Sequence, residues 1–354
     1  MPKNIINIKK MNTLKAFSNE YLTLHKHKKS SKDNTQAMIL NQPGQSKRKI
    51  KIHEIKTSHS DFRKVLRKMT LLKSLNHDNL VDLKNTLMVQ NHVFLEFDYV
   101  DYNLKQVLRE KNKGLTDDHV KYIFYQIMLA VAYLHSQNIE HLNLSPDAVL
   151  LTNECDVKLS RFSEANPVFL PKPAELKSIY QDYYVAPEII LNNGNNAHCP
   201  FKADIWALGC IFFELLERKN VLGYKRQYLD QLTWMFRLLG SPERKQLSWI
   251  KNLEAQKWVS RLKSHPKKSA SSYVGPKNAD DQARDLLDKM LKIDPFKRAE
   301  IKELLRHPFF NELYHEKDLD FANSGVKIVD FLACHPNNES LRSMRMAAIK
   351  LGMQ

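Results

Sequence analysis

Glycine is scarce in this chain. Nine of the 354 residues are glycine, and none of them precedes Gly44. A loop that wraps a phosphate group with backbone N–H groups depends on glycine, because a Cβ would block the close approach. The residues before Gly44 therefore contain no glycine-rich phosphate-binding loop.

Cysteine and long apolar runs are scarce as well. The four cysteines lie far apart and form no C-x-x-C pair, which excludes a disulfide framework or a paired zinc site and is typical of a reduced, intracellular chain. No run of 18 uncharged apolar residues occurs, so we expect no transmembrane helix. The start, MPKNIINIKKMNTLK, lacks the apolar core of a signal peptide. We expect the protein in the cytoplasm, and we leave the nucleus open.

Acidic residues are few relative to basic ones. The net charge is +16, and residues 1–60 alone hold 13 Lys and Arg against three Asp and Glu, a difference of +10. This region is either a solvated basic surface or a binding site for an anionic partner such as a phosphoprotein, a nucleic acid or a membrane surface. Only Phe17 and Tyr21 are aromatic within residues 1–35, which argues against a single-stranded nucleic acid.

The hydrophobic pattern divides the chain near residue 102. Before it, alternation predicts strands within 21–55 and 86–100 and a turn at 42–45, and helical spacing predicts one helix over 61–75. After it, the period is mostly 3.6. A helix begins after Thr116, a hairpin forms from AVLL and DVKL, and further helices follow at 204–217, 228–239, 280–292 and 299–306. The pattern predicts an α+β protein with a small β-rich lobe followed by a helical lobe.

Several motifs resemble those of protein kinases. HLNLSPDAVLL is similar to the catalytic loop H-R-D-L-x-x-x-N, RFS stands where D-F-G is found, and VAPE matches A-P-E. YLDQLTWMFRLLGSP and ADDQARDLLDKML narrow the resemblance to the MAP kinases, especially the extracellular-signal-regulated branch. The resemblance spans about residues 17–320. It implies a bilobal fold with a basic tail (1–16), an N-lobe with one main helix (17–101), a larger α-helical C-lobe (102–312) and a C-terminal extension (313–354).

The nucleotide-binding positions that the resemblance implies have changed. Lys28–Asn34 replace the glycine-rich loop, and His53 replaces the phosphate-binding lysine of V-A-I-K. Lys68 replaces the helix glutamate that would pair with that lysine, so we expect no attractive ion pair between the two positions. The adenine pocket would be lined by Lys51, Phe97 and Leu150. Burying the ammonium group of Lys51 against an apolar base would cost free energy.

The catalytic positions have changed as well. Leu142 and Asn143 replace the Arg and Asp of the loop, and Ser145 replaces its lysine. Asn143 can orient a hydroxyl group but cannot accept its proton. Ala148 and Arg161 replace the two magnesium ligands, so a cation stands where the metal would be held. We therefore expect no intact catalytic residue, no metal site and no binding of ATP or magnesium.

The positions that stabilise the kinase fold are kept. Leu72, Leu83, His141 and Phe162 match the stacked apolar spine, and Asp204 matches the helix aspartate that anchors the catalytic loop. Glu188 and Arg298 match the buried ion pair beneath the activation segment. Leu176-Lys177-Ser178 occupies the T-x-Y position and Asp182 replaces a phosphate-binding arginine, so we expect no activation by phosphorylation.

The acidic stretch after the last kinase helix is a candidate docking site. Asp318 falls on a docking aspartate of MAP kinases, whereas His315 replaces another. Glu316 and Asp320 could restore the charge, and Lys317 opposes it. The alternative is an ordinary solvated acidic stretch.

These observations indicate a pseudokinase that works by binding signalling proteins, including proteins with MAP kinase docking motifs, as a scaffold, decoy or allosteric partner. One alternative is an atypical serine/threonine kinase with residual or metal-independent activity, in which Arg161 and Lys68 supply the charge of magnesium. The other is a basic module that binds nucleic acid or a membrane surface.

Overall fold

The computed structural model describes residues 22–23, 35–40, 48–56, 59–89, 92–110, 114–168, 184–192, 199–219, 228–243 and 247–321. The chain divides into two compact units. The first contains the described residues of 1–76 and 81–100, and the second those of 77–80 and 101–324. The basic tail, the loop Lys28–Asn34, the turn at 42–45, the T-x-Y position with Asp182 and the C-terminal extension beyond 321 lie outside the described residues.

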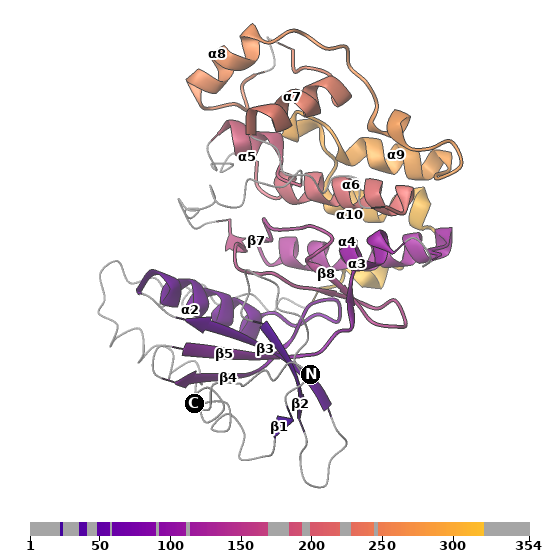
Figure 1. The fold of residues 1–354 in the computed structure, drawn as a ribbon. Coiled ribbons are helices and arrows are strands. Elements are labelled where there is room, and N and C mark those ends of the chain that lie inside the picture. The colour runs from indigo at the N-terminus through magenta and orange to yellow at the C-terminus, as the bar shows by residue number, and fades with distance from the viewer. Residues whose placement is uncertain are drawn as a thin grey trace, which may run out of the picture. The chain divides into compact units, whose positions relative to one another are not determined.

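The described part of the first unit contains a five-stranded antiparallel sheet and the helix α2 (Figure 1). The strand order is β1-β2-β3-β5-β4. The strands are β1 (Leu22–Thr23), β2 (Thr35–Leu40), β3 (Arg48–Lys56), β4 (Leu83–Val89) and β5 (His92–Asp98), and the helix is α2 (His59–Ser74).

The burial pattern explains these elements. Burial alternates along β3: Ile50, Ile52 and Glu54 are buried, whereas Lys51 and His53 are partly buried. This alternation is the period of two that is typical of a strand. Buried side chains of α2 recur at helical spacing, at Val65, Leu66, Met69 and Leu72. The sheet and α2 therefore fix the spacing between positions 53 and 68, which belong to the candidate site.

The second unit is mainly helical. Its α-helices are α3 (Leu104–Arg109), α4 (Asp117–Ser136), α5 (Pro187–Leu191), α6 (Lys202–Glu217), α7 (Tyr228–Leu239), α8 (Leu253–Arg261), α9 (Asp281–Met290) and α10 (Ile301–Leu305). Short 3-10 helices are η3 (Ala270–Tyr273), η4 (Pro295–Lys297), η5 (Pro308–Phe310) and η6 (Glu316–Leu319). Two small sheets have the orders β6-β8-β9 and β10-β7, formed by β6 (Tyr102–Asn103), β7 (Ile139–Glu140), β8 (Val149–Leu151), β9 (Val157–Leu159) and β10 (Asn166–Pro167).

Helices α4 and α6 lie side by side at the centre of the second unit (Figure 1). The rings of Phe124 on α4 and Phe212 on α6 stack with their centroids 4.3 Å apart, and both side chains are fully buried. The predicted start of α4 is confirmed, since Thr116 is its N-cap and accepts a hydrogen bond from the backbone N–H of His119. Strands β7 and β9, which flank the HLNLSPDAVLL loop in the sequence, pack against α4.

The predicted fold class is confirmed: a small sheet-containing N-lobe and a helical C-lobe form a mixed α+β kinase fold. In the described parts of the chain, no helix is both long and apolar enough to cross a membrane.

Candidate nucleotide site and catalytic loop

Strand β3 and helix α2 bring His53 and Lys68 together. The Lys68 Nζ atom lies 3.3 Å from the His53 Nδ1 atom, and both side chains are partly buried. A lysine ammonium group can only donate, so a hydrogen bond between these two atoms uses the lone pair of His53 Nδ1 as the acceptor. The structure thus brings the two family positions into contact, but as a lysine–histidine hydrogen bond rather than an ion pair between the two.

The adenine-pocket positions are only partly apolar. Lys51 stands opposite Phe97 of β5 in the sheet register and is partly buried, and Phe97 is buried. The Lys68 Nζ atom also lies 5.9 Å from the centroid of the Phe97 ring, within the range of a cation–π contact. One ammonium group, that of Lys68, therefore lies near the ring of Phe97, and a second lysine, Lys51, stands opposite Phe97 in the sheet.

In the second unit, Asp204 at the start of α6 holds the catalytic loop. Its carboxylate accepts hydrogen bonds from the backbone N–H groups of His141 (2.8 Å) and Leu142 (2.9 Å) and lies 3.0 Å from Nε2 of His135. Burial alone would raise the pKa of Asp204, but the hydrogen bond and charge of His135 and the neighbouring His141 hold this pKa below its usual value. Leu142 has a φ of 59°, a left-handed conformation that the two backbone bonds to Asp204 secure.

His141 is completely buried and ties the loop to the strand that follows. Its Nε2 atom lies 2.8 Å from the carbonyl oxygen of Ser160, and its Nδ1 atom accepts the backbone N–H of Asn143 at 3.2 Å. Its ring centroid lies 5.0 Å from that of Phe162. The second unit thus brings together the two spine positions it contains, and the other two, Leu72 and Leu83, are buried in the first unit.

The catalytic positions themselves contain no acid. Asn143 is partly buried, whereas Ala148 is fully buried and its carbonyl oxygen accepts bonds from the N–H (2.8 Å) and hydroxyl (2.9 Å) of Ser160. Arg161 is exposed and has a φ of 67°. Asp147, which precedes Ala148 directly, pairs with Lys105 of α3. Among the described residues, no cluster of three or more His, Cys, Asp or Glu side chains could hold a metal ion.

Glu188 and Arg298 form a buried bidentate ion pair. The two N···O distances are both 2.7 Å, and the side chains are 1% and 0% exposed. Arg298 also donates to the carbonyl oxygen of Lys202 at 2.6 Å and lies over the ring of Trp206 at 5.2 Å. The pair joins α5, which follows the activation segment, to the segment between α9 and α10.

Two of the three candidate docking acids have side-chain partners within the second unit. Asp318 accepts the hydroxyl of Tyr125 at 2.5 Å, and burial together with this hydrogen bond raises the pKa of Tyr125. Glu316 pairs with Arg306 and accepts the hydroxyl of Tyr314. Asp320 and Glu316 are exposed, whereas Asp318 is partly buried.

Some contacts of the site were not predicted from the sequence. His135 as a third partner of Asp204, Lys105 as the partner of Asp147 and Tyr125 as the donor to Asp318 all join residues more than 40 positions apart. One of these contacts had a signal in the sequence. The family motif identifies Asp204 as the residue that anchors the catalytic loop, and a buried carboxylate in that role accepts several hydrogen bonds.

Comparisons with known proteins agree with this geometry. The protein kinase domain family matches residues 39–310. Mitogen-activated protein kinase 5 of Arabidopsis thaliana is 33% identical over 265 residues, which cover 73% of this chain and 68% of the relative. Mitogen-activated protein kinase 2 of the same plant is 34% identical over 271 residues (75% and 70%), and the homolog MMK2 of Medicago sativa is 32% identical over 259 residues (72% and 68%). The fold and the match together define a protein kinase domain. Within that class, the chain belongs to the MAP kinase-like family.

Proposed function

We propose that this chain is a MAP kinase-like pseudokinase that acts by binding other signalling proteins rather than by transferring phosphate. The observation that carries the proposal is the residue set at the transfer positions: His53, Lys68, Asn143, Ala148 and Arg161. None of these five residues carries a carboxylate, whereas the positions that hold the fold keep Glu188 and Asp204. The fold is retained and the chemical groups are not.

Electrostatics supports the loss of magnesium. Two unit charges about 4 Å apart interact with roughly 4 kcal/mol at an effective dielectric of about 20. A divalent ion beside Arg161 would be repelled where a carboxylate would attract it, and Ala148 offers no oxygen from its side chain. We therefore propose that neither ATP with magnesium nor magnesium alone is a ligand of this chain.

A role in protein binding is supported by the relatives and by the surface of the chain. The relatives are named as mitogen-activated protein kinases, and the η6 segment carries Glu316 and Asp318, which the resemblance to that family makes candidate docking acids. We propose signalling proteins with basic docking motifs as partners. The basic residues of 1–60 are a second candidate surface, for an anionic partner.

A phosphoryl-transfer assay tests the proposal. The purified chain is incubated with radiolabelled ATP, magnesium or manganese, and a mixture of serine- and threonine-containing peptides, with an active MAP kinase as control. We expect no label on the peptides or on the chain itself. Metal-dependent labelling that disappears when Asn143 is changed to Ala would overturn the proposal. Labelling without metal that needs Arg161 and Lys68 would do the same, in favour of an atypical transferase.

A further inference from the structure

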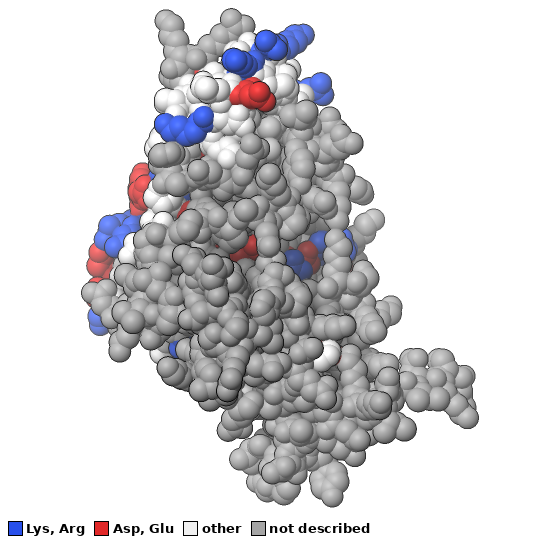
Figure 2. Space-filling view, turned by 90° about the vertical axis from the view of Figure 1, so that its left-hand side faces the viewer, with Lys and Arg blue, Asp and Glu red and all other residues white. Residues whose placement is uncertain are grey.

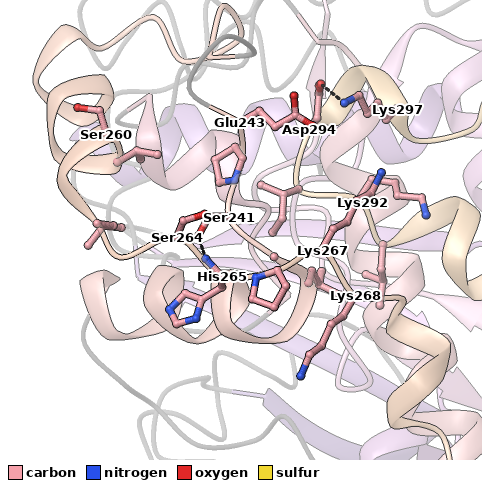
Figure 3. Close-up of a pocket in the computed structure, with 18 residues that line it drawn as sticks. Ser241, Glu243, Ser260, Ser264, His265, Lys267, Lys268, Lys292, Asp294 and Lys297 are labelled. Atoms are coloured by element: carbon pink, nitrogen blue, oxygen red, sulfur yellow. Dashed lines mark hydrogen bonds and ion pairs between the residues drawn. The ribbon is translucent and has the colours of Figure 1, made fainter.

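A cavity of about 560 Å³ opens in the second unit, and none of the catalytic positions is among the residues that line it (Figure 3). It is lined by residues 239–243 at the end of α7, by residues 259, 260, 262 and 264–268 at and after the end of α8, and by residues 291–294 and 297 between α9 and the end of η4. Its volume lies within the range of about 300–1,000 Å³ typical of ligand pockets. Neither the fold nor the proposed function assigns this cavity a role.

Backbone contacts shape one wall of the cavity. Ser241 and His265 exchange two bonds, from the Ser241 N–H to the His265 carbonyl oxygen (3.1 Å) and from the His265 N–H to the Ser241 hydroxyl (3.0 Å). Gly240 has a φ of 93°, and a Cβ there would lie 2.5 Å from the Cα of Lys267. The segment that carries Lys267 is therefore packed directly against the end of α7, which fixes its backbone.

The cavity is rich in positive charge. Four lysines line it against two acids, Glu243 and Asp294, and Asp294 lies 3.7 Å from one of the lysines, Lys297. In Figure 3, Lys267 and Lys292 extend toward the side where Lys297 lies, whereas Lys268 points the other way. Within the described residues, the ammonium groups of Lys267 and Lys292 make no ion pair.

The acids around Lys292 are already engaged. Asp288 accepts bonds from the backbone N–H (3.0 Å) and hydroxyl (2.6 Å) of Ser271 and from Ser269, and Asp285 pairs with Lys289 and His307, both at 2.8 Å. Burial lowers the pKa of Lys292; Asp288 opposes this shift and Lys267 adds to it. A partly buried ammonium group beside a second one is stabilised by a ligand that brings negative charge.

The surrounding surface is basic too. Residues 251–268 hold six Lys and Arg and one acid, Glu254. Figure 2 shows Lys and Arg side chains gathered at the top of the view, where α8 lies. Such a surface raises the association rate of an anionic partner.

We propose that this cavity binds a phosphorylated serine or threonine side chain of a partner polypeptide. The phosphate group carries a charge of about −1.5 to −2 near neutral pH and accepts several hydrogen bonds, so it matches Lys267 and Lys292 together. A cavity of this volume, open beside a basic surface, also holds the residues that flank the phosphate. The inference deepens the proposed function, on which it rests, by naming a chemical class of partner.

Fluorescence anisotropy with the full chain tests this proposal. The probe is a labelled alanine-rich pentapeptide with one phosphoserine, compared with its unphosphorylated form at low salt. We expect the phosphorylated peptide to bind at least roughly tenfold more tightly, and the variant Lys267→Met with Lys292→Met to lose roughly that factor. The control Lys277→Met with Lys302→Met removes the same charge from exposed positions outside the cavity and should bind like the unmodified chain. Inorganic phosphate should displace the peptide.

Equal binding of the two peptides would overturn the proposal, and so would unchanged affinity in the cavity variant. An equal loss in the control would assign the binding to net charge and would overturn it too. Methionine removes the charge of lysine and keeps most of its aliphatic bulk. If the double variant does not fold, the single variant Lys267→Met, at an exposed position, tests the same loss of affinity. The assay contains no nucleotide, so its result is independent of whether the chain binds ATP.

Discussion

Asp204 and His141 show at the scale of single residues how a catalytic loop keeps its shape after its reactive groups have changed. Asp204 accepts two backbone N–H groups, and His141 links the loop to Ser160. Removing either would leave buried backbone donors or acceptors unsatisfied, at a cost of about 1–3 kcal/mol each. Within the described part of the chain, the side chains of Asn143 and Arg161 make no such hydrogen bond. The residue types at these two positions therefore differ from the family motif without disturbing the contacts of Asp204 and His141.

The buried pair Glu188–Arg298 gives a prediction at the same scale. Glu188→Gln leaves Arg298 buried without a countercharge, so we expect the free energy of unfolding to fall by about 3–5 kcal/mol. Urea denaturation measures it. The matched control is Glu316→Gln, which removes the 70% exposed partner of Arg306, itself 52% exposed, and should leave the free energy of unfolding nearly unchanged. Equal losses in the two variants would show that burial does not set the strength of the Glu188 pair.

Elements differ in how well the sequence predicted them. Helices α2, α4, α7 and α9 were predicted closely because each is long enough to show a buried stripe of period 3.6. The five residues of α5 and the two of β6 are too short for any periodicity, and packing against the rest of the unit defines them. The family motifs identified most positions of the candidate site, whereas their partners, such as His135 and Tyr125, depend on tertiary packing.

The η6 segment gives a prediction at the scale of one element. Exposed acids act mainly on association rate and salt dependence. We predict weak, salt-sensitive binding of a basic MAP kinase docking peptide, lowered several-fold by Glu316→Gln with Asp318→Asn, two changes that remove charge and keep an oxygen for Tyr314 and Tyr125. Anisotropy at low and high salt measures it.

The control for this experiment is Glu254→Gln with Glu303→Gln, two exposed acids outside η6. It removes the same charge and should leave the peptide affinity unchanged. If the η6 variant binds the peptide as tightly as the unmodified chain at low salt, the acidic segment is an ordinary solvated surface.

At the scale of the whole molecule, a kinase fold coincides with a net charge of +16 and with altered nucleotide positions in both units. The first unit provides Lys51, His53 and Lys68, and the second provides Ala148 and Arg161. A neighbouring residue could take over the nucleotide contact of one altered position. With five altered positions in two separate units, five such contacts would have to be replaced. The proposed loss of nucleotide binding therefore rests on residues of both units rather than on one loop.

Titration with ATP, with and without magnesium, tests this account most directly. A ligand that binds only the native state at 100 times its Kd stabilises it by about 2.7 kcal/mol, which raises the melting temperature by several degrees. We predict no rise at saturating ATP with magnesium, while an active MAP kinase measured alongside shows one. A magnesium-dependent rise in this chain that is lost on Lys51→Glu would contradict the account.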